Sequence, residues 1–235
     1  SRVDFKDKKH SLFVGSCGTY RLYTVKKLPT HRPRGRVDYQ LLYIASGKAH
    51  FYFNGKEQVV SAGNMVLYRP KEEQRYYYYG AEHPEVYWVH FTGNNVKNIL
   101  RKYGIADDVH VICSGISMEY KQLYQNMIQE LQLKQEDYEE LLVNYLRQLF
   151  ILIHRQFLTK PRKKNPMIMD DMAQAVEYFR THYNKPVSIE DYAASHNISV
   201  SWFIQNFKQY TNTTPAQYVQ LLRTTNAKSL LETTN

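Results

Sequence analysis

Residues 188–231 read SIEDYAASHNISVSWFIQNFKQYTNTTPAQYVQLLRTTNAKSLL, and this stretch decides the fold of the C-terminal part of the chain. It holds three signals for the start of a helix. Ser188 stands three residues before Asp191, and a Ser and an acid at this spacing satisfy free backbone N–H groups at a helix N-terminus. Ser199 is a second candidate N-cap. Thr214 is a third, because Pro follows it at the first helical position and Gln stands three residues after it.

A short break separates the first two of these helices. It consists of His196 and Asn197, and Asn adopts the left-handed backbone of a tight turn more readily than most residues. Two short helices joined by such a turn form a helix-turn-helix. The stretch therefore predicts an all-α helix-turn-helix subdomain.

The second helix, expected over residues 200–210, has two distinct faces. Val200, Phe203 and Phe207 fall together at 100° per residue and are expected to face the core. Trp202 lies on the flank, and the opposite face carries no acid and one cation: Ser201, Gln205, Lys208 and Gln209. This set suits a helix in the DNA major groove, where Gln pairs with adenine and Lys meets phosphate. The solvated face of an ordinary three-helix domain has the same periodicity.

The order of residues in this stretch is more specific than its periodicity. The motifs are Ser199-x-Ser201-Trp202-Phe203-x-x-x-Phe207-Lys208-x-Tyr210-Thr211, Pro215-x-x-Tyr218 and Arg223-x-x-x-Ala227-x-x-Leu230-Leu231. They resemble the first helix-turn-helix of AraC-family transcription regulators. The resemblance implies that the helix at 200–210 reads double-stranded DNA and that the next helix connects rigidly to a second helix-turn-helix. The sequence stops at Asn235, about where that second module is expected to begin, so we expect it to be absent.

The composition favours a soluble two-domain protein. The chain has 235 residues, enough for two domains. Its two cysteines, Cys17 and Cys113, are far apart, which is typical of a reducing compartment and not of a disulfide scaffold. It has no run of 18 apolar residues, and the polar start SRVDFKDKKH lacks the core of a signal peptide. We expect a cytoplasmic protein with no membrane partner.

Positive charge is concentrated away from the expected DNA-binding part. Residues 1–115 hold 18 Lys and Arg against 10 Asp and Glu, whereas residues 166–235 hold 5 against 6. Because phosphate contacts dominate non-specific affinity for DNA, the C-terminal module alone is expected to bind weakly. Strong binding then requires a dimer or the second helix-turn-helix.

Residues 17–91 alternate with period two between turn residues, which predicts many short strands. Asn54-Gly55 between apolar runs is a strong hairpin signal. Many short strands at this spacing predict a sandwich or small barrel. We expect strands at residues 20–25, 39–44, 49–53, 58–60, 63–70, 76–79 and 86–91.

The motifs of this half are Asp38-Tyr39-Gln40-x-x-Tyr43-x-x-x-Gly47, Gly63-Asn64-x-x-x-Tyr68-Arg69-Pro70 and Tyr87-Trp88-Val89-His90-Phe91-x-Gly93. Over residues 15–160 the chain resembles the cupin-type sensor domain of AraC-like regulators. The resemblance implies a jelly-roll β-barrel whose mouth holds a small effector, commonly a sugar. The fold class is therefore α+β, with a barrel, a helical dimerisation segment and the helix-turn-helix subdomain.

Candidate effector-binding residues combine an aromatic ring with polar and basic side chains. Trp88 matches the position at which the arabinose-responsive family member stacks a Trp on its ligand. The remaining candidates lie on the strand before Trp88 or near the start of the barrel: Arg75, Tyr77, Arg34, Arg36 and His31. Tyr and Trp on strands also commonly serve as core or exposed-face residues.

A cupin can instead be an enzyme, which here means a cupin enzyme fused to a helical interaction domain. Metal-binding cupins carry a His-x-His pair, which this chain lacks, and His50 and His90 stand alone among strand residues. The adjacent pairs Glu72-Glu73 and Asp107-Asp108 point to opposite faces of a strand and make poor acid/base pairs. We expect no metal, no cofactor and no catalytic residue.

Helical periodicity returns after Gly93, with helices expected at 94–103, 116–133, 135–158 and 168–183. The resemblance implies that the helix at 135–158 pairs two sensor domains in a homodimer. The expected domains are residues 1–158 for effector binding and dimerisation, a basic linker at 159–166, and residues 167–235 for DNA binding. The apolar stripe of the helix at 135–158 is Tyr138, Leu141, Leu142, Tyr145, Leu149, Leu152 and Ile153.

Overall fold

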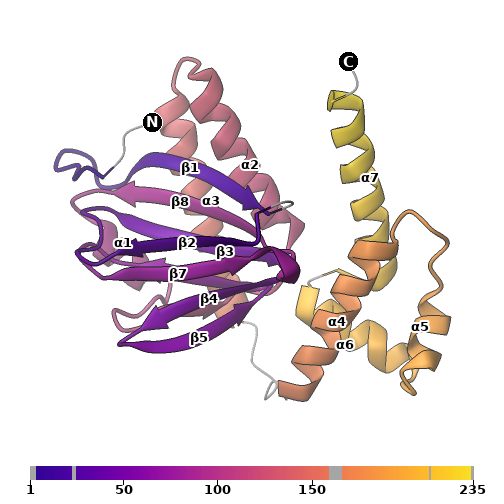
Figure 1. The fold of residues 1–235 in the computed structure, drawn as a ribbon. Helices are drawn as coiled ribbons and strands as arrows, with labels where there is room; N and C mark the ends of the chain where they lie inside the picture. The colour runs from indigo at the N-terminus through magenta and orange to yellow at the C-terminus, as the bar shows by residue number, and fades with distance from the viewer. Residues whose placement is uncertain (1–3, 23–24, 159–165, 212, 234–235) are drawn as a thin grey trace. The chain divides into compact units, whose positions relative to one another are not determined.

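The computed structural model of the chain describes residues 4–22, 25–158, 166–211 and 213–233. Tertiary contacts divide the chain into two compact units, Ser1–Pro161 and Arg162–Asn235 (Figure 1). The expected linker at 159–166 lies outside the described residues except for Pro166. None of the described helices is long and apolar enough to cross a membrane.

The described part of the N-terminal unit holds two antiparallel sheets (Figure 1). The five-stranded sheet has the order β1-β8-β3-β6-β9 and is formed by Phe13–Arg21, Glu85–Thr92, Tyr39–Ser46, Asn64–Tyr68 and Val111–Cys113. The four-stranded sheet has the order β2-β7-β4-β5 and is formed by Lys27–Arg32, Gln74–Tyr79, Lys48–Phe53 and Lys56–Ser61. A single 3-10 turn, Gly80–Glu82, precedes β8.

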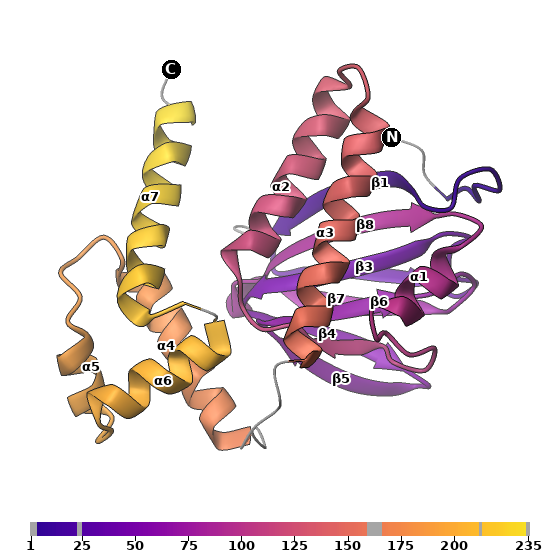
Figure 2. The same cartoon turned by 180° about the vertical axis from the view of Figure 1, so that it is seen from behind.

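Three helices of the same unit cover one face of the five-stranded sheet (Figure 2). Leu41, Tyr43, Val89 and Phe91 point to this face and pack on the helices in one apolar core. The alternate residues of the same strands face the four-stranded sheet, as the period of two requires. The helices are α1 (Val96–Lys102), α2 (Met118–Leu133) and α3 (Tyr138–Leu158). The predicted α+β class with an N-terminal cupin-like β unit is confirmed.

The hairpin predicted at Asn54-Gly55 joins β4 to β5. Both residues have positive φ, 51° and 75°, as a two-residue primed turn requires. Phe53 pairs with Lys56 across this turn, and the register continues to Lys48 opposite Ser61. The turn residues therefore set the register of the edge of the four-stranded sheet.

The first strands differ from the prediction. The strand expected at 20–25 begins earlier, at Phe13, and β1 ends at Arg21; residues 23 and 24 lie outside the described residues. The sequence pattern also missed β2 and β9. β2 contains Pro29 and alternates between exposed and half-buried residues, so it lacks a clear apolar period. β9 has three residues and forms only beside β6.

The described part of the C-terminal unit contains four helices, α4 (Pro166–His182), α5 (Ile189–Ser195), α6 (Val200–Thr211) and α7 (Pro215–Thr233). All three predicted caps form. The backbone N–H of Asp191 donates to Ser188 Oγ at 2.9 Å, and that of Trp202 donates to Ser199 Oγ at 3.2 Å. The N–H of Gln217 donates to Thr214 Oγ1 at 3.3 Å. The predicted turn is also present, because Asn197 has a φ of 53°.

Aromatic rings form the core of this unit. Phe179 of α4 lies 5.3 Å from Tyr192 of α5 and 5.5 Å from Phe207 of α6, measured between ring centroids. Phe203 and Phe207 are fully buried, as their shared helical face predicts, whereas Val200 is partly exposed. The apolar face of α6 therefore fixes this helix to the unit and leaves its polar face outward.

Candidate functional site

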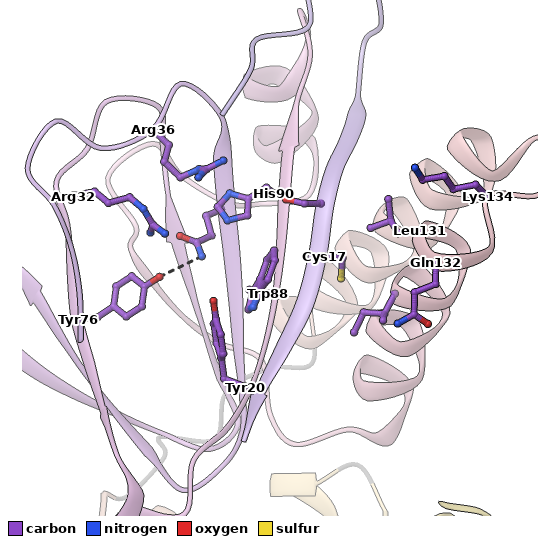
Figure 3. A pocket seen from close by; sticks show the side chains of 13 residues that line it. Cys17, Tyr20, Arg32, Arg36, Tyr76, Trp88, His90, Leu131, Gln132 and Lys134 are labelled. Carbon is purple, nitrogen blue, oxygen red and sulfur yellow. Dashed lines mark hydrogen bonds between the residues drawn. The ribbon is translucent and has the colours of Figure 1, made fainter. Parts of the chain in front are cut away.

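A cavity of about 540 Å³ opens in the N-terminal unit between the two sheets and reaches α2 (Figure 3). This volume is within the range of sites for small organic ligands. The lining residues come from β1, β2, β3, β7, β8, α2 and the segments that flank them: Ser16, Cys17, Tyr20, Arg32, Arg36, Gln40, Tyr76, Trp88, His90, Ile128, Leu131, Gln132 and Lys134.

Strand alternation places the aromatic and polar lining residues. Trp88 and His90 are two apart on β8, so both point away from the helices, while Val89 between them packs into the apolar core. In Figure 3 the side chains of Tyr20, Tyr76 and Trp88 reach the same space from different strands. The indole of Trp88 packs over Gly18 of β1, where a Cβ would lie 2.4 Å from the ring. Gly18 thus lets the Trp ring lie close to the strand.

A buried ion pair forms one end of the cavity. Arg36 Nε and Nη2 donate to the two carboxylate oxygens of Asp38 at 2.7 and 2.9 Å, and His90 Nδ1 lies 3.3 Å from Asp38 Oδ1. Burial raises the pKa of Asp38, but the hydrogen bonds from Arg36 and His90 outweigh it and hold the pKa at about 2. Burial lowers the pKa of His90 against the opposing effect of Asp38. Asp38 therefore stays ionised and fixes both neighbours.

Several polar atoms inside the barrel have no hydrogen-bond partner among the described residues. They are Gln40 Oε1, Gln74 Nε2, Tyr78 OH and Trp88 Nε1. The amide of Gln40 donates to Tyr76 OH only at 3.5 Å. Unpaired buried polar atoms are costly, and a ligand or water that pairs with them recovers that free energy. Gln40 and Trp88 line the cavity, so the interior offers both an acceptor and a donor to a polar ligand.

The six sequence-predicted effector residues do not lie together. Trp88 and Arg36 line the cavity. Arg75 and Tyr77 lie on the opposite face of β7 from Tyr76, where the Arg75 guanidinium stacks on the ring of Tyr52 at 4.4 Å. The two remaining predicted residues, His31 and Arg34, are exposed and outside the lining, and His31 pairs with Glu73 at 2.9 Å.

The other eleven lining residues were not predicted, and four of them are polar or aromatic residues on or beside predicted positions or motifs: Arg32, Gln40, Tyr76 and His90. Arg32 is the neighbour of the predicted His31, and Tyr76 is the neighbour of both predicted residues of β7. A shift of one residue along a strand changes its face. Gln40 and His90 carried a usable signal, because each is a polar residue within an otherwise apolar buried strand.

The second candidate site is the exposed face of α6. Ser201, Gln205, Lys208 and Gln209 are exposed there, and Trp202 is partly buried on its flank. The side chain of Asn206 donates to the carbonyl oxygen of Trp202 at 2.8 Å and so turns back onto the helix. These five predicted DNA-binding residues form one accessible surface on a helix fixed by Phe203 and Phe207.

The stripe predicted on α3 divides between two environments. Leu142 and Leu149 are fully buried in the apolar core of their own unit. Leu141 of the stripe is exposed at 39%, and two apolar residues of α3 outside the predicted stripe, Ile151 and Leu158, are exposed at 37% and 68%. Most of the stripe therefore stabilises the monomer, and only its outer edge is available to another surface.

Among the described residues, no three His, Cys, Asp or Glu side chains gather closely enough to hold a metal ion.

Residues 14–157 match the family described as the AraC-like ligand binding domain. The chain belongs to this family. The match spans the two sheets and the helices that cover them, and it includes every residue that lines the cavity. The resemblance inferred from the motifs around Asp38, Gly63 and Tyr87 is confirmed.

Curated members of the AraC family resemble the chain over most of its length. The lactose operon transcription activator of Staphylococcus xylosus is 26% identical over 191 residues, covering 80% of this chain and 68% of the relative. The Msm operon regulatory protein of Streptococcus mutans is 24% identical, covering 85% and 72%. An uncharacterized HTH-type transcriptional regulator of Bacillus subtilis is 24% identical, covering 89% and 78%. These relatives are transcription regulators, and an AraC-like chain of this kind is a ligand-responsive regulator.

Proposed function

We propose that the chain regulates transcription in response to a sugar that binds in the barrel cavity. The observation that carries the proposal is the composition of that cavity within an AraC-like ligand-binding domain. Tyr20, Tyr76 and Trp88 supply aromatic faces, and Gln40 and Trp88 supply unpaired polar atoms. Stacking rings together with fixed hydrogen-bonding groups suit a ring with several hydroxyls. The lactose operon activator of Staphylococcus xylosus adds support from a relative.

A thermal-shift screen of the purified chain against sugars tests the ligand. A ligand that binds only the native state raises the melting temperature. Trp88→Ala is expected to abolish this shift and to leave the protein folded, because Trp88 lines a cavity instead of a packed core. The matched control is Tyr77→Ala, on the outer face of the barrel, which is expected to keep the shift. A grossly unfolded Trp88→Ala variant overturns the assignment of Trp88 to the site.

DNA recognition is assigned to the exposed face of α6. Gln205→Ala is expected to weaken binding to a cognate site by about 1–3 kcal/mol and to relax preference at one base pair. Lys208→Ala is expected to weaken all sequences alike and to reduce the salt slope by about one. Gln220→Ala, on the exposed side of α7, is the control. If both α6 variants bind cognate and random DNA as the parent chain does at one fixed salt concentration, α6 is not the reader.

We propose that two copies pair through the outer edge of α3. Leu142 and Leu149 are buried in the monomer, so charged residues there would unfold the unit. The informative variant is the double replacement Leu141→Glu, Ile151→Glu on the exposed edge. It is expected to shift a dimer to a monomer in sedimentation at tens of micromolar. A parent chain that is monomeric under these conditions rejects the dimer.

A cupin enzyme is the competing function, and metal analysis separates the two. Stoichiometric iron, manganese or zinc in the purified protein would favour the enzyme. If the chain is a regulator, it is expected to bind DNA sequence-specifically, and the sugar is expected to change its affinity for DNA. The affinities for effector and DNA are then coupled reciprocally.

A further inference from the structure

The charged side chains that line the described cavity wall are all basic. Arg32, Arg36 and Lys134 line it, and none of its described lining residues is a carboxylate. Asp38 lies behind the wall and is bound to Arg36 by two hydrogen bonds. This ion pair compensates one of the three cations, and among the described residues no ion pair involves Arg32 or Lys134.

Arg32 is the cation best placed to act on a ligand. Its Nη1 donates to Gln74 Oε1 at 2.9 Å, and Gln74 is fully buried, so a neutral amide holds the guanidinium in place. No ion pair involves Arg32 among the described residues. In Figure 3 the side chain of Arg32 extends from its strand toward Tyr76, next to Arg36 and His90. A guanidinium fixed by one bond keeps its other N–H groups for a planar anion.

We propose that the effector is an anionic sugar, in which a carboxylate or phosphate binds Arg32 while the ring lies against Trp88. This inference rests on the proposed function and specifies the chemical class of its ligand. A neutral sugar would leave Arg32 facing a polar ring with no counter-charge in a partly desolvated site. An anionic group on the ligand provides the missing counter-charge. Charge-assisted hydrogen bonds are strong in such a partly desolvated site. The cavity volume of about 540 Å³ accommodates a hexose with one such group.

Two matched sets of sugars test the proposal by isothermal titration of the whole chain. One set is glucose, glucuronate and glucose 6-phosphate, and the other is galactose, galacturonate and galactose 6-phosphate. An acid or phosphate is expected to bind at least about 10-fold more tightly than its neutral parent, as one charge-assisted contact provides. The uronate and phosphate arms also distinguish a carboxylate ligand from a phosphate ligand.

Two substitutions attribute the preference to Arg32. Arg32→Gln removes the cation, and Gln74→Glu leaves Arg32 in place but gives it an internal carboxylate. Both are expected to reduce affinity for the anionic sugar about 10- to 100-fold and to leave the neutral parent within about threefold. Arg34→Gln, exposed and outside the lining, is the matched control and keeps the preference.

The outcomes separate this inference from the proposed function. If neutral and anionic sugars bind the parent chain equally, the anionic class is rejected. If the preference survives in both variants, its assignment to Arg32 is rejected. The sugar-responsive regulator stands in both cases. If no sugar of either set binds, but benzoate or citrate does, both the sugar and the anionic sugar are rejected. Gln74→Glu keeps the proposal testable if Arg32→Gln fails to fold, because it replaces only the amide NH2 group by an oxygen and leaves the side-chain size nearly unchanged.

Discussion

The two faces of the five-stranded sheet differ in chemistry although the same strands form both. On the face toward α1, α2 and α3, strand β8 presents Tyr87, Val89 and Phe91 to a continuous apolar core. On the face toward the barrel interior it presents Trp88 and His90 to the cavity. Strand alternation thus gives one strand two roles.

The two faces also differ in whether their buried polar atoms have hydrogen-bond partners. On the helix side, the hydroxyl of Tyr87 donates to Glu85 Oε1 at 2.8 Å, and Glu85 also pairs with Arg21 and Lys121. Inside the barrel, Tyr78 OH and Trp88 Nε1 have no partner among the described residues. The helix side therefore pairs the Tyr87 hydroxyl and the Glu85 carboxylate, although His154 Nδ1 of α3 is unpaired among the described residues. The barrel interior retains several unsatisfied groups of the kind that binding sites require.

The largest expected difference between the faces comes from removing one ring on each. Phe91 is fully buried and lies 5.4 Å from the ring of Tyr39 and 5.7 Å from that of Phe150. Phe91→Ala is expected to lower the free energy of unfolding by about 3–5 kcal/mol. Trp88→Ala enlarges an existing cavity and is expected to lower it by about 1–2 kcal/mol, below the usual range for packed rings. Urea denaturation followed by circular dichroism measures both.

Val59→Ala, at an exposed residue of β5, is the control for these ring deletions and is expected to change stability by less than about 0.5 kcal/mol. Equal losses from Phe91→Ala and Trp88→Ala would mean that the interior is packed like the helix side. The assignment of the cavity to ligand binding would then fail.

Acid is expected to destabilise the interior through Asp38. Its folded pKa is about 2, below the usual 3.8, so the unfolded chain binds more protons in this range. Its stabilisation, about 2 kcal/mol, is complete above pH 4 and is lost as the pH falls toward 2. The lowered pKa of His90 has the same sign, and its contribution is lost as the pH falls below 6.5.

Variants isolate these two contributions in denaturation measured from pH 7 to pH 2. His90→Gln should flatten the dependence just below pH 6.5, and Asp38→Asn should flatten it between pH 4 and pH 2. Glu85, whose pKa is also about 2, and Asp7, where burial raises the pKa but hydrogen bonds from His10 and Lys9 lower it overall, remain in both variants and contribute to the residual acid loss. An unchanged slope in Asp38→Asn below pH 4 would show that Asp38 is not paired as described.

The sequence predicted most of the helices and strands. It was less successful in predicting which face of a strand each side chain occupies. The caps at Ser188, Ser199 and Thr214 and the turn at Asn54 were predictable because they depend on neighbouring residues. The side of β7 was not, since Tyr76 to Tyr79 are four aromatic residues in a row and carry no polarity period. The cavity residue Arg32 lies on a strand that forms only by pairing with β7. The candidate site therefore depends on pairings that the local sequence does not encode.

The smallest effect gives the sharpest comparison, because replacing Tyr by Phe is expected to change stability with opposite signs on the two sides. Tyr87 lies on the helix side of the five-stranded sheet, and Tyr78 lies in the barrel interior on β7 of the four-stranded sheet. Tyr87→Phe removes a hydrogen bond to the buried Glu85 carboxylate and is expected to destabilise the protein by about 1 kcal/mol, since Arg21 and Lys121 still pair with Glu85. Tyr78→Phe removes a buried hydroxyl that has no partner among the described residues and is expected to stabilise it by about 1 kcal/mol. Both rings are almost completely buried, so the change in volume is matched. Denaturation midpoints at neutral pH measure the two shifts. Destabilisation by both would mean that Tyr78 OH is satisfied by an ordered water, and the contrast between the two faces would be lost at this position.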